Sequence, residues 1–234
     1  MIGARGWGRA TARRLEMILV IIPWALAPAA GRGGHREAAP RDAVSEARLV
    51  EAALNSLTAM TALFTQTLES PALPSPQVER GVVYLQRPGR VRFEYEEPKG
   101  KLAIADGERT YLYLPEERQV LVAPLGARGT RGGISLLLQE RIDLVAEFAV
   151  AWGPEPPGGG ARPLTLTPRV PRPEYQSLLL EVDSDHLVTA LTLVDPLGSR
   201  ITYRFSRLRR AAALDGALFR FAAPPGVSVR EAER

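Results

Sequence analysis

The sequence predicts a mainly β protein of the α+β class, in which one long antiparallel sheet carries an N-terminal helix and a central helical insertion. Three observations predict this class. Short segments that alternate apolar and polar residues follow one another at hairpin intervals, and Asp106-Gly107 joins two of them with a dipeptide typical of tight turns. Apolar residues recur at helical spacing before the strand series and again in its middle. A sheet of this many strands has to curl or close.

The strands are predicted from this alternation and from the Gly and Pro residues that separate them. In the segment 90–96, Val91, Phe93 and Tyr95 fall on one face of a strand while charged residues fall on the other. The segment 214–229 is predicted to form a short turn or helix followed by an edge segment. The predicted strands are 61–69, 78–86, 90–96, 101–106, 109–114 and 118–123, then 163–167, 174–182, 186–194 and 200–208.

Two regions have the apolar spacing of helices. The first is predicted at about 44–58, with Ser45 as its cap and with apolar residues at Leu49, Val50, Ala53, Leu54 and Leu57. The second lies within 130–150, where Ile134, Leu137, Leu138 and Ile142 indicate a short helix or two. The helices are therefore expected to cover one face of the sheet.

The N-terminal part of the chain is typical of an exported protein. A basic leader precedes an apolar run, and Ala27-Pro28-Ala29 matches the pattern that signal peptidase prefers, so residues 1–29 are predicted to be a signal peptide. The run spans about 14 residues, short of the roughly 20 that a membrane-spanning helix needs. Residues 30–43, rich in Gly, Pro and charge, are predicted to be a disordered arm, and 44–234 a single domain.

Composition excludes several kinds of chemistry. Of the formal net charge of +4, the leader holds +3, so the remainder gives no reason to expect a nucleic-acid partner. The absence of cysteine excludes disulfides, thiolate catalysis and cysteine metal sites. His35 and His186 are far apart in the sequence, so neither a metal nor another cofactor is expected. His186 follows Ser184 in a turn, which leaves a hydrolase as one alternative, but such adjacency does not build a catalytic triad, and no enzymatic activity is expected.

The absence of catalytic motifs favours a binding protein. By alternation, one face of the curled sheet is expected to carry Val83, Leu85, Val91, Phe93, Leu102 and Ile104. These residues either line a cavity for an apolar ligand or simply form the core. Arg87 shares the face of Val83 and Leu85, and either bonds the backbone carbonyls of a covering helix or is a solvated turn residue before Pro88.

At these residues the sequence resembles the periplasmic outer-membrane lipoprotein carrier family, LolA. The resemblance covers most of the mature chain, and the order and spacing of its segments are more specific than any one of them. The matching segments are ALFTQTLES at 62–70, GVVYLQRPGRVRFEYEEP at 81–98, LAIADGERTYLYLPEERQV at 102–120, ISLLL at 134–138, LTLTPR at 164–169 and LFRFAAPPGVSV at 218–229.

The resemblance implies an unclosed antiparallel half-barrel whose concave apolar face is covered by a lid of short helices. It implies a monomeric periplasmic chaperone that takes acylated lipoproteins from an inner-membrane lipoprotein-releasing ABC transporter and passes them to an outer-membrane lipoprotein acceptor. By resemblance, Ile134, Leu136, Leu137 and Leu138 belong to the lid, Arg87 locks the lid, and Phe64 joins the residues that line the cavity.

Three positions depart from the family's pattern. Tyr84, Phe93 and Tyr111 stand where the family often has tryptophan, which would reshape the cavity. The alternative function is therefore binding or transfer of a different amphiphile, a glycolipid or a fatty acid, by a protein of the same fold.

Overall fold

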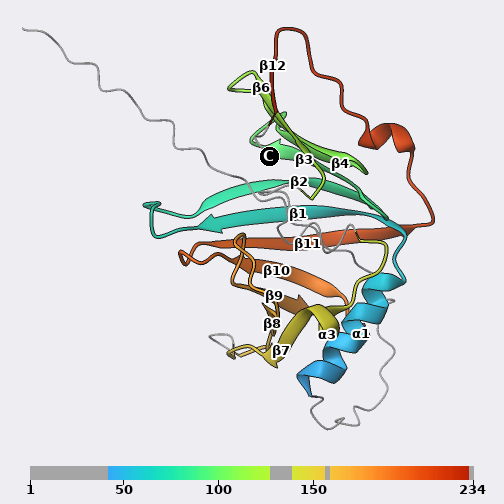
Figure 1. The fold of residues 1–234 in the computed structure, drawn as a ribbon, viewed down its shortest axis with the longest axis vertical. Coiled ribbons are helices and arrows are strands. Elements are labelled where there is room, and N and C mark those ends of the chain that lie inside the picture. Colours follow the sequence, from blue (N-terminus) through green and yellow to red (C-terminus); the bar gives the residue numbers. More distant parts are fainter. Residues whose placement is uncertain (1–41, 127–138, 156–158, 232–234) are drawn as a thin grey trace, which may run out of the picture.

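The computed structural model describes residues 42–126, 139–155 and 159–231, which form one strongly twisted sheet with two helices beside it (Figure 1). Within these residues twelve strands follow the order β12-β6-β5-β4-β3-β2-β1-β11-β10-β9-β8-β7. Because β12 and β7 each have a single neighbour, the sheet is unclosed. Its strands pair antiparallel with one another, except that β12 runs parallel to β6.

The elements have the following bounds. The first half contains α1 (Ala43–Asn55), β1 (Ala59–Glu69), β2 (Gln77–Gln86), β3 (Arg90–Glu97), β4 (Leu102–Asp106), β5 (Arg109–Leu114) and β6 (Gln119–Pro124). The second half contains α3 (Leu144–Glu147), β7 (Phe148–Trp152), β8 (Leu164–Pro168), β9 (Ser177–Val182), β10 (Val188–Val194), β11 (Arg200–Ala211), the 3₁₀ helix η1 (Gly216–Phe219) and β12 (Ser228–Glu231).

The N-terminal helix forms where the sequence predicts it, but its cap is Asp42 and not Ser45. The Asp42 side chain accepts a hydrogen bond from the backbone N–H of Ser45 at 2.9 Å, which satisfies one of the unpaired amides of the first turn. The helix therefore begins at Ala43, one residue inside the predicted arm. Its buried side includes Ala47, Val50 and Leu54.

The predicted strands are confirmed, with one strand missed. Residues 148–150 were expected to belong to the helical insertion, but they form the first part of the edge strand β7, and α3 ends at Glu147. Within β7, Phe148, Val150 and Trp152 are less exposed than the alanines between them, which is the alternation of a strand. This alternation is short, and the helical spacing of the apolar residues that precede it made the whole region look helical.

A single cluster of buried apolar side chains joins the helix to the sheet. It includes Val50 and Leu54 of α1, Phe64 of β1, Phe148 of β7 and Leu191 of β10. We call the sheet face whose side chains enter this cluster the inner face, and the opposite one the outer face.

Candidate functional site

Arg87 directly follows β2 and binds backbone carbonyls from two other parts of the chain. One Nη group donates to the carbonyl oxygen of Leu54, at the C-terminal end of α1, at 2.6 Å. The rest of the guanidinium donates to the carbonyl oxygens of Gln139 and Glu140, with three contacts between 2.9 and 3.2 Å. Burial lowers the pKa of Arg87, but an arginine keeps its charge. The guanidinium therefore ties α1 and the segment after residue 138 to the sheet.

Side chains of α1 hold the same segment from the helix side. Asn55 forms two hydrogen bonds with the backbone of Ile142. Its side-chain NH₂ group donates to the carbonyl oxygen of Ile142 at 2.8 Å, and its side-chain oxygen accepts from the N–H of Ile142 at 2.9 Å. Glu51 accepts a hydrogen bond from the N–H of Leu144 at 2.9 Å. The stretch between Gln139 and Leu144 is thus fixed by Arg87, Asn55 and Glu51 together.

The inner face of β1 to β3 is aromatic and aliphatic. The ring of Phe64 meets Phe93 edge to face, with centroids 4.9 Å apart, and Tyr95 in the same way at 5.1 Å. Tyr203 of β11 lies 5.9 Å from Phe93. Five of the predicted lining residues are buried in the core cluster on this face: Phe64, Val83, Leu85, Val91 and Phe93.

Leu102 and Ile104 were predicted to lie on the inner face as well, and for these two residues the prediction was wrong. The register pairs Leu102 with Glu94 and Ile104 with Arg92, so both side chains belong to the outer face. Ala103 and Ala105 lie on the inner face instead, opposite Phe93 and Val91.

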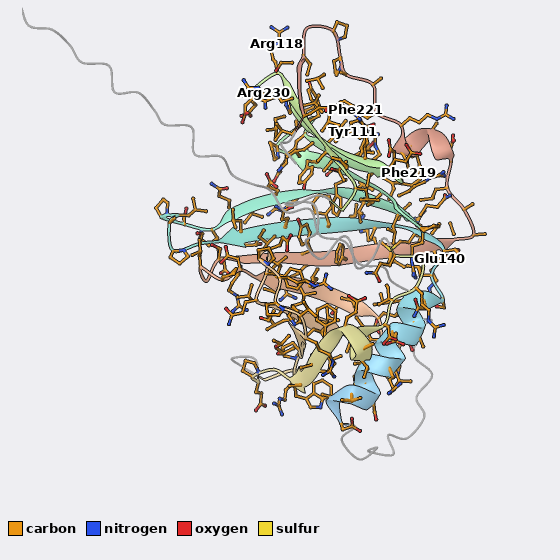
Figure 2. The ribbon with its side chains drawn as sticks, in the orientation of Figure 1. Tyr111, Arg118, Glu140, Phe219, Phe221 and Arg230 are labelled. Atoms are coloured by element: carbon orange, nitrogen blue, oxygen red, sulfur yellow. The ribbon has the colours of Figure 1, made fainter. Side chains whose placement is uncertain are left out.

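Outer-face residues of β3 to β5 contact the C-terminal part of the chain. The helix η1 packs against β3 and β4, and its Phe219 is buried. Phe221 stacks on Tyr111 with centroids 5.2 Å apart, and Tyr113 lies 6.2 Å away (Figure 2). Tyr111 and Tyr113, which the sequence left open, therefore face outward.

The predicted lid residues Ile134, Leu136, Leu137 and Leu138 lie outside the described residues, as does the predicted signal peptide. His186 lies in the turn between β9 and β10, and its Nδ1 is 2.6 Å from a carboxylate oxygen of Glu46 on α1. This contact joins the turn to the helix. Among the described residues, no cluster of His, Cys, Asp or Glu could hold a metal ion. Within the same residues, no helix has the length and apolar character needed to span a bilayer.

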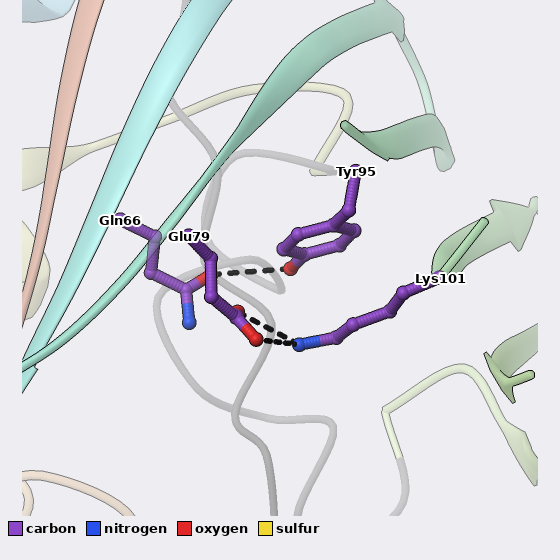
Figure 3. Close-up of polar contacts among 4 residues, drawn as sticks. All are labelled: Gln66, Glu79, Tyr95 and Lys101. Atoms are coloured by element: carbon purple, nitrogen blue, oxygen red, sulfur yellow. Dashed lines mark hydrogen bonds and ion pairs between the residues drawn. The ribbon is translucent and has the colours of Figure 1, made fainter. Parts of the chain in front are cut away.

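The sequence reasoning missed a polar cluster on the inner face, formed by Gln66, Glu79, Tyr95 and Lys101. The Nζ of Lys101 donates to both carboxylate oxygens of Glu79 at 2.6 and 2.7 Å, and the Tyr95 hydroxyl donates to Gln66 at 3.1 Å (Figure 3). The Lys101 side chain is only 2% exposed. The sequence gives one indication that Lys101 belongs to this cluster. Lys101 directly follows the turn that ends at Gly100, and alternation from there places its side chain on the same face as Tyr95.

The predicted turn role of Asp106 is confirmed, and it gives the fold a pH dependence. Asp106 accepts hydrogen bonds from the N–H groups of Glu108 and Arg109 at 2.8 Å and from the Tyr111 hydroxyl at 3.0 Å. Burial opposes ionisation, but these hydrogen bonds outweigh it, so the pKa of Asp106 lies below its usual 3.8. Ionised Asp106 therefore stabilises the fold above pH 3.8, and this contribution is lost as the pH falls through the lowered, folded-state pKa.

We accordingly expect Asp106→Asn to lower the free energy of unfolding at neutral pH. The difference from the natural protein should shrink as the pH falls below 3.8, because the natural carboxyl then becomes protonated as well. Urea unfolding at a series of pH values measures this difference. Asp185→Asn is the control, since Asp185 is exposed in another turn. If the difference in the free energy of unfolding between Asp106→Asn and the natural protein does not shrink below pH 3.8, the lowered pKa of Asp106 is contradicted.

An unclosed, largely antiparallel sheet with an apolar inner face, to which an arginine ties a helix and a connecting segment, places the chain in the class of mainly β proteins built on one open sheet. The family model described as outer membrane lipoprotein carrier protein LolA matches residues 55–222. The chain belongs to the LolA family.

Curated relatives agree with this assignment. An outer-membrane lipoprotein carrier protein from Chromohalobacter salexigens is 31% identical over 183 residues, which is 78% of this chain and 85% of the relative. One from Methylibium petroleiphilum is 32% identical over 168 residues, 72% of this chain and 80% of the relative. Among solved structures, a LolA superfamily protein from Nitrosomonas europaea aligns with a TM-score of 0.43 and 12% identity, covering 78% of this chain and 99% of the other.

Proposed function

We propose that this chain is a periplasmic carrier that binds the acyl chains of lipoproteins and shuttles them from the inner to the outer membrane. Its membership of the LolA family is the observation that carries the proposal. The buried aromatic and aliphatic inner face supports it, because acyl chains need an apolar surface that is shielded from water. In this proposal residues 1–29 are removed as a signal peptide, 30–43 form an arm, and 44–234 form the carrier domain.

The mechanism we propose is a competition between the lid and the cargo for the same apolar face. The sheet acts as a half-barrel, and Ile134 to Leu138 form part of a lid that packs on the inner face when no cargo is bound. Arg87 supports this role because it holds Gln139 and Glu140, which directly follow the lid segment. Acyl chains displace the lid, and re-closure of the lid favours their release.

The energetics of transfer favour direct handover of the cargo, and the partners are those that the resemblance to the LolA family implies. Each CH₂ group moved from water to an apolar surface gains about 0.8 kcal/mol, so an acylated protein would leave the carrier into water very slowly. We therefore infer direct handover, from an inner-membrane lipoprotein-releasing ABC transporter to this chain and from this chain to an outer-membrane lipoprotein acceptor. The carrier works as a monomer and performs no catalysis in this scheme.

The test is to purify the protein from the periplasm and to identify its bound species by mass spectrometry. A co-purifying triacylated lipoprotein is the expected result. A bound glycolipid or fatty acid without any lipoprotein would favour the alternative, a LolA-like protein for another amphiphile. Protein that is free of lipid, and that also fails to take up a synthetic acylated peptide, would overturn the proposal.

A further inference from the structure

The polar cluster of Gln66, Glu79, Tyr95 and Lys101 lies where an acyl-binding face would be expected to be apolar. Its members come from β1, β2, β3 and the residue before β4, and their side chains point toward one another (Figure 3). Gln66 pairs with Glu79 across β1 and β2, and Tyr95 contacts Phe64 edge to face. The cluster therefore adjoins the aromatic part of the inner face directly.

Stability alone does not account for an ion pair in this position. Lys101 and Glu79 are 2% and 20% exposed, so both lose most of their hydration on folding. Burial lowers the pKa of Lys101, although Glu79 partly offsets this effect. Replacing such a buried pair with well-packed apolar residues is often neutral or stabilising, so the presence of the pair is weak evidence for a role in stability.

We propose that this cluster is a polar subsite that binds the ester and amide carbonyl groups joining the acyl chains to the cargo. The proposal rests on the proposed carrier function and names the part of the ligand that the inner face recognises. The hydrocarbon tails then lie over Phe64 and Phe93, with their polar linkage at Lys101.

The chemistry of the cluster selects neutral carbonyl groups. Its one cation and one anion balance, so a ligand carboxylate would add an uncompensated negative charge beside Glu79. Ester and amide carbonyls accept hydrogen bonds and carry no charge. The cluster supplies two donor groups for them, the ammonium group of Lys101 and the amide nitrogen of Gln66, which Figure 3 shows directed away from Tyr95. The hydroxyl of Tyr95 holds Gln66 in place by donating to its amide oxygen.

The position of the cluster also gives the ligand a direction. Glu79 lies near the start of β2 and Arg87 directly follows its last residue, so at about 3.3 Å per residue they are roughly 26 Å apart along the strand direction. Val83 and Leu85 of the core cluster lie between them on the inner face. Acyl chains held at Lys101 would therefore extend over apolar surface toward the end of the sheet that Arg87 closes.

The test compares two synthetic peptides with the full mature chain. In one, the N-terminal cysteine carries a diacylglyceryl group with two ester-linked chains; in the other, ether links replace the esters and the chain length is kept. We expect the natural protein to bind the ester peptide about tenfold more tightly, the effect of one hydrogen bond to a charged group. Lys101→Met should bind both peptides with the affinity that the natural protein has for the ether peptide.

Two further variants keep this test decisive. Lys99→Met removes the same charge from an exposed position two residues away and should keep the full preference for the ester. Tyr95→Phe removes only the hydroxyl that holds the Gln66 side chain, so it tests the subsite if Lys101→Met does not fold. It should reduce the ratio between the affinities for the ester and ether peptides.

Equal affinity of the natural protein for both peptides would overturn the subsite while leaving the carrier function in place. The subsite is also overturned if Lys101→Met loses affinity for both peptides equally, which is the result of a purely structural role. Failure of the natural protein to bind either peptide would overturn the carrier function itself.

Discussion

Replacing Gly81 with alanine is expected to lower the free energy of unfolding by roughly 3 kcal/mol or more. A Cβ atom at this position would lie 1.9 Å from the carbonyl oxygen of Glu94 and 2.9 Å from the Cα of Tyr95. Both atoms belong to the backbone of β3, so neither can move aside without breaking the pairing of β2 with β3. Gly81 also lies between Phe64 and Tyr95 in the strand register, and its missing side chain lets their rings meet.

Urea unfolding of the purified variant measures this effect. Gly216→Ala is the matched control, because a Cβ at Gly216 would have no neighbour within 4 Å. Its free energy of unfolding should stay within about 0.5 kcal/mol of the natural value. A Gly81→Ala protein as stable as this control would show that β2 and β3 approach less closely than the structure indicates.

Most of the sheet could be predicted from the sequence because period-two alternation and turn residues are local signals. Asp106-Gly107 is the clearest case, since Gly107 adopts a φ of 110°, which other residues rarely adopt. Arg87 was likewise placed on the correct face by counting from Leu85. Its partners at Gln139 and Glu140 were not identifiable individually, because they depend on the tertiary fold.

The wrong face for Leu102 and Ile104 has a physical cause: alternation shows that side chains are buried but not which side of the sheet they face. In β4, Ala103, Ile104 and Ala105 are all buried, because the core covers one face and η1 covers the other. A strand that is covered on both sides has no polar face to set its phase. Lys101 was missed for the related reason that its partner, Glu79, comes from a different strand.

Replacing Arg87 with leucine is expected to leave the fold intact and to tighten the binding of an acylated peptide about tenfold or more. The guanidinium bonds to Leu54, Gln139 and Glu140 are present in the structure without ligand. If the lid has to leave the inner face before cargo binds, these bonds stabilise only the closed state. Removing them shifts the population toward the open state, and hydrogen bonds to a charged group are worth roughly 1.5 to 3 kcal/mol each.

The measurement is a fluorescence titration with a labelled diacylglyceryl peptide, together with the rate at which the peptide passes to lipid vesicles. Arg87→Leu should release the peptide more slowly, by about the factor that it gains in affinity. Arg90→Leu removes an exposed arginine from the first position of β3, three residues after Arg87, and should change neither the affinity nor the release rate. Arg87→Lys keeps the charge but loses the planar guanidinium group that reaches three carbonyl groups. Its affinity for the peptide should therefore lie between those of the natural protein and Arg87→Leu.

The sign of the change decides between two roles for Arg87. If the residue only holds the fold together, its loss should weaken peptide binding and lower the unfolding midpoint in parallel. If it acts as a lock, affinity should rise although the ligand-free protein becomes less stable, because the lost bonds belong to the state without cargo. Unchanged affinity and unchanged release in Arg87→Leu would show that the carbonyl contacts do not control access to the inner face.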